Sequence, residues 1–106
     1  MNIDMTQVVT AADKAAAADA ERLAAVKAEC RRRILAVADE TAQINMASAA
    51  AAGLLTAAQM TTYAAGLGWV DAMRATWPTM PANTDYLADT AWPAVPAGVA
   101  ELAAAF

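Results

Sequence analysis

The chain has 106 residues, a formal net charge of −4, a single cysteine and no histidine. This length suits one small domain, and the acidic balance argues against a general nucleic-acid binder, which presents a basic surface. The lack of histidine excludes Ser–His and Cys–His catalysis and the usual zinc sites. One cysteine allows no intrachain disulfide, so the chain fits a reducing compartment.

Alanine supplies about half of the hydrophobic residues, which together make up 59% of the chain. Alanine buries little apolar area, so each helical turn adds weakly to a core. A chain of this size that folds alone buries only a modest share of its surface. We therefore expect a long alanine-rich helix to need contacts with a partner for its stability.

Residues 1–9 alternate in part between apolar and polar side chains, with Ile3 and Met5 on one side. A lone strand has nothing to pair with in a helical chain. The segment is therefore either a flexible arm or a strand added to the edge of a partner's sheet. It lacks the basic and apolar regions of a signal peptide.

Residues 11–52 contain neither glycine nor proline and predict one long helix. Thr10 is the expected N-cap, with Asp13 at the reciprocal capping position, and Gly53 suits the left-handed residue that closes a helix. A heptad-like apolar stripe runs along this helix. Its main members are Leu23, Val26, Cys30, Val37 and Ile44. The stripe fits either one face of an antiparallel helical hairpin or a seam that needs helices from other chains.

Three consecutive cations, Arg31, Arg32 and Arg33, point in directions about 100° apart around a helix, so they form no flat phosphate-binding face. Glu29 is placed to pair with Arg33 four residues later. The cluster indicates a solvated helix surface, with an acidic protein partner as the other interpretation.

A second helix is predicted over residues 57–76, opened by Thr56 with Gln59 at the capping-box position. Gly66 and Gly68 are expected to allow close packing against the alanine-rich end of the first helix, and Asp71 and Arg74 to form an exposed pair. One face of this helix carries apolar residues at helical spacing, namely Met60, Tyr63, Leu67, Val70 and Trp77. The short connection favours antiparallel neighbours, so the predicted fold class is all-α, built as a helical hairpin. Residues 41–70 carry no charge, but polar side chains punctuate them and argue against a membrane span.

Residues 78–106 form a tail with four prolines, for which we expect irregular structure, a helical turn over residues 84–89, and a short last helix over residues 97–106. Aromatic residues anchor protein interfaces, so this tail is a candidate partner contact. The aromatic candidates are Trp77, Tyr86, Trp92 and Phe106.

No motif predicts catalysis, a metal or a cofactor. Gly66-Leu67-Gly68 lacks the third glycine and the preceding strand of a dinucleotide loop. The pairs Asp39-Glu40 and Asp85/Asp89 have no neighbours that would separate the pKa values of an acid and a base. We expect no enzyme activity and no small-molecule substrate.

Residues 31–78 resemble the helical segment of small tail-fibre-assembly and tail-accessory proteins of tailed bacteriophages. The elements that carry the resemblance are the basic start at Arg31 to Arg33, Gln43 and Asn45, the Gly53-Leu54 break, Trp69-Val70, and Met73 before Trp77-Pro78. The resemblance implies a small helical protein that holds another tail protein, and it transfers no catalytic residue.

The sequence therefore leads to three functional hypotheses. The first is a phage tail structural or accessory protein of the virion, assembled in the host cytoplasm. It docks in several copies, by its helical hairpin and terminal arms, on a larger tail, baseplate or fibre protein. The second is an assembly chaperone that is absent from the mature virion. The third, which the acidic net charge disfavours, is a small DNA-binding regulator that uses Arg31, Arg32 and Arg33.

Overall fold

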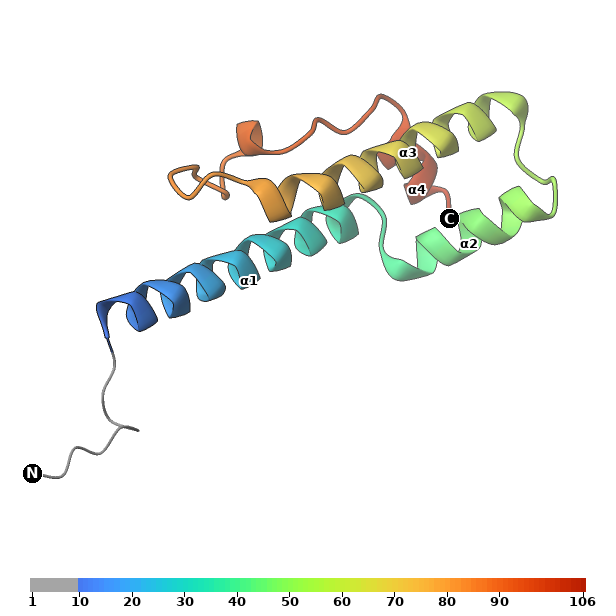
Figure 1. Cartoon of the computed structure of the whole chain (residues 1–106). Coiled ribbons are helices and arrows are strands. Elements are labelled where there is room, and N and C mark those ends of the chain that lie inside the picture. The colour runs from blue at the N-terminus through green and yellow to red at the C-terminus, as the bar shows by residue number, and fades with distance from the viewer. Residues whose placement is uncertain (1–9) are drawn as a thin grey trace, which may run out of the picture.

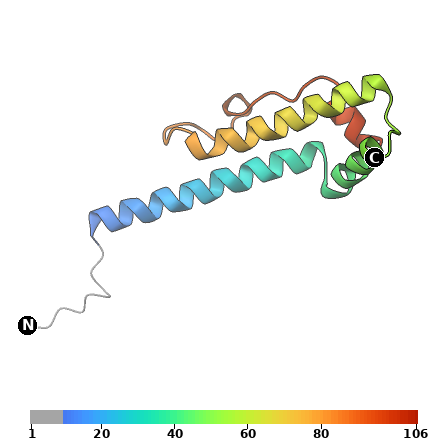
Figure 2. The same cartoon turned by 45° about the vertical axis from the view of Figure 1, so that its right-hand side comes forward.

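The computed structural model describes residues 10–106, which form an all-α structure without strands (Figures 1 and 2). Four α-helices, α1 (Ala11–Val37), α2 (Glu40–Ala51), α3 (Ala57–Thr76) and α4 (Val99–Ala104), are joined by irregular segments. Two short 3₁₀ turns, η1 (Trp77–Thr79) and η2 (Asp89–Ala91), lie between α3 and α4. The predicted fold class is confirmed. The proposed strand or arm at residues 1–9, including Ile3 and Met5, lies outside the described residues.

The prediction of one continuous helix over residues 11–52 is wrong, because the chain breaks at Ala38 and Asp39. Ala38 is extended, with φ −143° and ψ 109°, and Asp39 becomes the N-cap of a new helix. The Asp39 carboxylate accepts from the backbone N–H of Ala42, and the Gln43 side-chain amide donates to the Ala38 carbonyl at 2.8 Å. Side-chain hydrogen bonds of aspartate compete with helical ones, which explains how an alanine-rich segment stops here.

The predicted helix caps are confirmed. Thr10 and Asp13 form a reciprocal capping box at the start of α1, and Thr56 and Gln59 form another at the start of α3. Gly53 follows α2 with a φ of +70°, the left-handed conformation that glycine adopts without steric cost.

The antiparallel hairpin is formed by α1 and α3, which run in opposite directions in both views (Figures 1 and 2). The two tryptophans of its core are each hydrogen-bonded. Trp69 Nε1 donates to the Pro93 carbonyl at 3.0 Å, and Trp92 Nε1 donates to the Tyr86 carbonyl at 2.8 Å. The tail thus closes the hairpin as a third layer. The buried members of this core are Val26, Cys30, Ile34, Trp69, Met73 and Trp92.

A second, smaller core joins α2 to α4. Met46 of α2 packs with Leu102 and Ala103 of α4, while Tyr63 of α3 lies at its edge. Gly66 serves close packing as predicted, but its neighbour is Val99 of α4, only 3.3 Å from where a Cβ would stand, rather than the end of the first helix. As a result α4 lies between α2 and α3 and holds them apart.

The tail differs from its prediction in detail. The expected helical turn over residues 84–89 is a run of non-helical turns. The helical turn is instead the 3₁₀ turn η2, which begins at Asp89. The last helix is shorter than the predicted 97–106 and begins after Gly98, whose φ is +85°. Trp92 is extended, with φ −121° and ψ 152°.

Candidate functional site

The first half of α1 is an arm that projects from the hairpin (Figure 1). Within residues 11–25 every residue is exposed except Arg22 and Ala25, which are half-buried. The arm begins to meet the body at Arg22, whose guanidinium donates to the Pro81 and Thr84 carbonyls at 2.7 and 3.1 Å. The arm is therefore a helix that contributes almost nothing to the core of its own chain.

One face of this arm is almost apolar. Ala12, Ala16, Asp19 and Leu23 recur at three- and four-residue spacing and so share one side of the helix. Leu23 is 43% exposed although it is large and apolar. Asp19 is the one charged group on this side, so the face combines small side chains, one leucine and one carboxylate.

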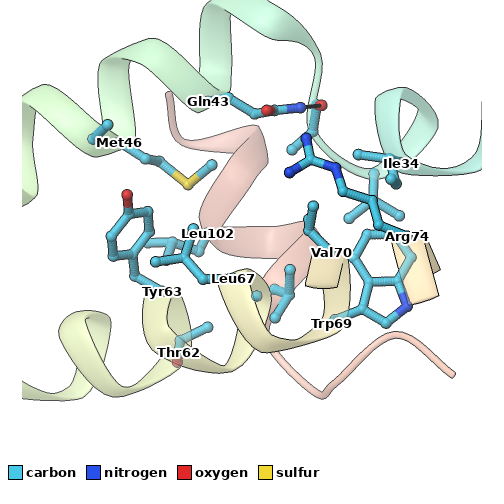
Figure 3. A pocket seen from close by; sticks show the side chains of 15 residues that line it. Ile34, Gln43, Met46, Thr62, Tyr63, Leu67, Trp69, Val70, Arg74 and Leu102 are labelled. Carbon is cyan, nitrogen blue, oxygen red and sulfur yellow. Dashed lines mark hydrogen bonds between the residues drawn. The ribbon is translucent and has the colours of Figure 1, made fainter. Parts of the chain in front are cut away.

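A groove lies between α2 and α3, next to the break at Asp39 that separates α1 from α2 (Figure 3). Its cavity measures about 230 Å³. The α3 wall is a row of apolar side chains that ends at the charged side chain of Arg74. Leu67 in this row, the α3 stripe, is 51% exposed. The α2 wall is Gln43, Met46 and Ala47, the floor is Val99 and Leu102 of α4, and the α3 stripe consists of Tyr63, Leu67, Val70 and Arg74.

Arg74 is the only charged residue among those that line the groove. The predicted Asp71–Arg74 pair is wrong: no salt bridge links Arg74 to a carboxylate within residues 10–106. Gln43 stands on the opposite wall near the same end of the groove (Figure 3). The groove is thus apolar along its length and positively charged at one end.

Two other hollows measure about 540 and 550 Å³, but their charged residues are mostly engaged inside the chain. In one, Arg33 bonds to Asp89 at 2.9 Å and lies over Trp92. In the other, Arg31 pairs with Glu40, and Lys27 lies 5.4 Å from the Trp77 ring. The charged residues of these two hollows are therefore mostly paired inside the chain, except Arg74, which lines the second hollow as well as the groove.

The arginine cluster is organised around Glu29, which is 7% exposed. Its carboxylate accepts from Arg32 at 2.6 and 2.7 Å and from Arg33 at 2.8 Å, so the predicted pair with Arg33 is confirmed. Hydrogen bonding to Arg32, helped by Arg33 and opposed by burial, lowers the pKa of Glu29 to about 2. The same contact raises the pKa of Arg32. All three arginines face carboxylates, and any phosphate would have to compete with them.

Three of the residues proposed as partner contacts are buried in the chain's own core. Val26, Cys30 and Trp92 are 0, 2 and 7% exposed, so in this conformation none is available to a partner. A packed stripe looks the same in sequence whether its partner lies in the same chain or in another, so the sequence could not show that these three side chains are buried.

The other proposed contacts divide into two groups. Leu23 and Ile44 are exposed, at 43 and 65%, and remain available. Four more are half-buried against one of the two cores, namely Val37, Trp77, Tyr86 and Phe106.

Sequence reasoning missed the groove. The apolar stripe of α3 was visible in the sequence, but it was assigned to packing against one long helix. The signal that could have revealed the groove is Asp39, an N-cap residue three positions before Ala42 in a run of good helix formers.

No helix in the described part of the chain is long and apolar enough to cross a membrane. Within residues 10–106 no group of three or more Cys, Asp or Glu side chains is arranged to hold a metal ion.

Comparison of the chain with protein-family models, curated proteins and solved structures gives no match.

Proposed function

We propose that this chain is a non-enzymatic structural protein of a phage tail, which docks in several copies on a larger tail, baseplate or fibre protein. The observation that carries the proposal is the α1 arm, whose residues 11–25 extend from the hairpin and are almost all exposed. Apart from Arg22, which bonds to the Pro81 and Thr84 carbonyls, the arm adds almost nothing to its own chain, and a contact outside the chain best explains it.

The composition of the arm supports this reading. In proteins most of the stability of a helix comes from packing one of its faces, and residues 11–21 of the arm are all exposed, so the arm gains stability if a neighbour covers it. Its small side chains let another helix approach closely. Its Leu23, exposed next to charged residues, is suited to insertion into an apolar surface.

The assignment to a phage tail is supported by the resemblance of residues 31–78. This segment begins near the end of α1 and runs through α2, α3 and the start of η1. It therefore corresponds to the helical body, while the arm and the tail lie on either side of it.

The arginine contacts favour a protein partner over DNA. Arg32 and Arg33 share the buried carboxylate of Glu29, and Arg31 pairs with Glu40. A DNA phosphate would have to displace these internal partners. In addition, the net charge of the chain is −4, which repels nucleic acid.

The test uses the particles made by the genome that encodes the chain. Quantitative mass spectrometry of purified particles is expected to find the chain at a fixed ratio to one tail protein. A variant in which residues 11–19 are deleted is expected to fold, by circular dichroism, but to be lost from the particles. A matched variant that keeps the arm and carries Ala65→Lys, an exposed position on α3, is expected to be retained.

Three results would contradict the proposal. Absence from particles together with binding to a free tail protein would favour the assembly chaperone instead. Retention of the arm-deleted chain would show that the arm is not the docking element. Salt-dependent DNA binding that is lost when the three arginines are changed to alanine would favour the DNA-binding regulator.

A further inference from the structure

We propose that copies of this chain associate head to tail, with the α1 arm of one copy seated in the groove between α2 and α3 of the next. The inference rests on the proposed function in that both assign the arm to a contact outside its own chain. Within a row of copies, the arm of the first copy is left to bind the tail protein, while each other arm is held by a neighbouring copy. It commits the groove to one occupant, a second copy of the same chain.

The first argument is the shape of the molecule. The arm projects at one end of the hairpin, whereas the turn between α2 and α3 lies at the other end (Figures 1 and 2). The groove lies between α2 and α3, the two helices that this turn connects (Figure 1). Two different surfaces at opposite ends give a heterologous contact, which repeats from copy to copy instead of closing as a symmetric dimer.

The second argument is steric fit. The groove is apolar on both walls but only about 230 Å³ in volume, so a helix with bulky side chains would not seat deeply. The arm presents Ala12 and Ala16 on the same face as Leu23, so its backbone can approach closely while one large side chain enters the cavity. The α3 stripe from Tyr63 to Arg74 spans roughly 17 Å, so the arm over residues 11–25, which is roughly 21 Å long, is long enough to cover it.

The third argument is charge complementarity. Arg74 is the only charged residue that lines the groove, and no carboxylate in residues 10–106 forms a salt bridge with it. Asp19 is the only charged residue on the apolar face of the arm. A single carboxylate on the occupant and a single guanidinium in the receptor attract each other and disfavour other occupants.

A contact made by one face of a 15-residue helix is small compared with stable protein interfaces of about 1,600 Å². We therefore expect association in the micromolar range or weaker, which becomes effective when many copies are held on one tail. Association should weaken with added salt, because the contact joins opposite charges near the surface.

The experiment uses the full chain in sedimentation velocity over a range of concentrations. The wild-type chain is expected to show a sedimentation coefficient that rises with concentration. Ala16→Lys, which blocks the arm, and Leu67→Lys, which blocks the groove, are each expected to weaken association at least tenfold. Ala18→Lys on the arm and Ala65→Lys on α3 add the same charge at exposed positions away from the contact and are expected to behave like wild type.

Mixing the two defective variants separates this model from other modes of association. A chain with Ala16→Lys keeps its groove, and a chain with Leu67→Lys keeps its arm. An equimolar mixture is therefore expected to form dimers that grow no further, although neither variant associates alone. All four substitutions are at exposed helical positions, and circular dichroism checks that each variant folds.

The inference is overturned if wild type stays monomeric up to about 1 mM, a concentration that reveals even weak complexes. It is also overturned if the blocked variants still associate, or if their mixture forms nothing, since the contact would then be symmetric or lie elsewhere. None of these results contradicts the proposed function, whose test is the presence of the chain in particles. An arm that binds a tail protein while the chain stays monomeric would preserve the function and remove this inference.

Discussion

The carboxylate of Asp39 accepts a 2.7 Å hydrogen bond from the backbone N–H of Ala42, and this contact begins α2. Without it, the helix propensities of residues 11–52 would favour one continuous helix. The groove between α2 and α3 exists because α2 leaves the line of α1 at this point. The cap at Asp39 and the packing of α4 against α2 together leave the α3 stripe open.

Replacing Asp39 with alanine is expected to destabilise the fold by about 1 kcal/mol, the usual cost of losing an N-cap side chain. The measurement is the free energy of unfolding in urea. Asp39→Asn is the matched control, because asparagine caps nearly as well and should cost much less. Equal losses in the two variants would show that the charge, and not the cap, is what α2 needs.

The pKa of Glu29 is lowered from 4.5 to about 2, so the folded state favours its ionised form. This stabilisation is present above about pH 4.5 and is lost as the pH falls toward 2. Glu29→Gln is expected to cost about 1–3 kcal/mol at neutral pH, because it weakens charge-assisted hydrogen bonds in a buried place. The gap between wild type and variant should shrink as the pH falls through this window.

The control for this prediction is Glu21→Gln on the exposed arm, which should leave stability almost unchanged at every pH. Denaturant unfolding at a series of pH values provides the data. A gap between wild type and Glu29→Gln that does not vary with pH would mean that Glu29 acts through packing and not through its charge.

Gly66 and Gly68 lie two residues apart in α3 but meet different surroundings. A Cβ at Gly68 would have no heavy atom within 4 Å, so Gly68→Ala is expected to stabilise the protein by about 0.5–1 kcal/mol through helix propensity. A Cβ at Gly66 would stand 3.3 Å from Val99, so Gly66→Ala should gain less or lose stability. Thermal melts of the two variants, compared directly, test whether α4 packs on α3 as described; an equal gain in both would contradict that packing.

Cys30 is 2% exposed, and its Sγ lies 3.5 Å from the Met73 carbonyl oxygen. Burial raises the pKa of the thiol, against a smaller opposing effect of Arg74. In the folded protein a thiol reagent should therefore react with Cys30 at least about tenfold more slowly than in the urea-unfolded chain. A variant with Cys30→Ala and an added Ala18→Cys on the arm should react quickly in both states, and rapid labelling of native Cys30 would show that the hairpin core opens.

Local signals in the sequence predicted much of the fold. Thr10 with Asp13 and Thr56 with Gln59 specify helix starts by hydrogen bonds within three residues, and the structure confirms both boxes. Gly53, which follows the end of α2, and the prolines, which make the tail irregular, also act only on the backbone next to them. The all-α class, the bounds of α3 and the pairing of Glu29 with Arg33 follow from such short-range chemistry.

The sequence alone determined where helices can begin and which faces are apolar, because capping and periodicity depend on neighbours along the chain. Only the tertiary structure decided which apolar face meets which. Val26 and Trp92 lie in one buried core, whereas the stripe around Leu67 was left partly open. The physical reason is that apolar burial has no direction: a leucine in a stripe gains the same free energy from a partner in its own chain as from a neighbouring copy.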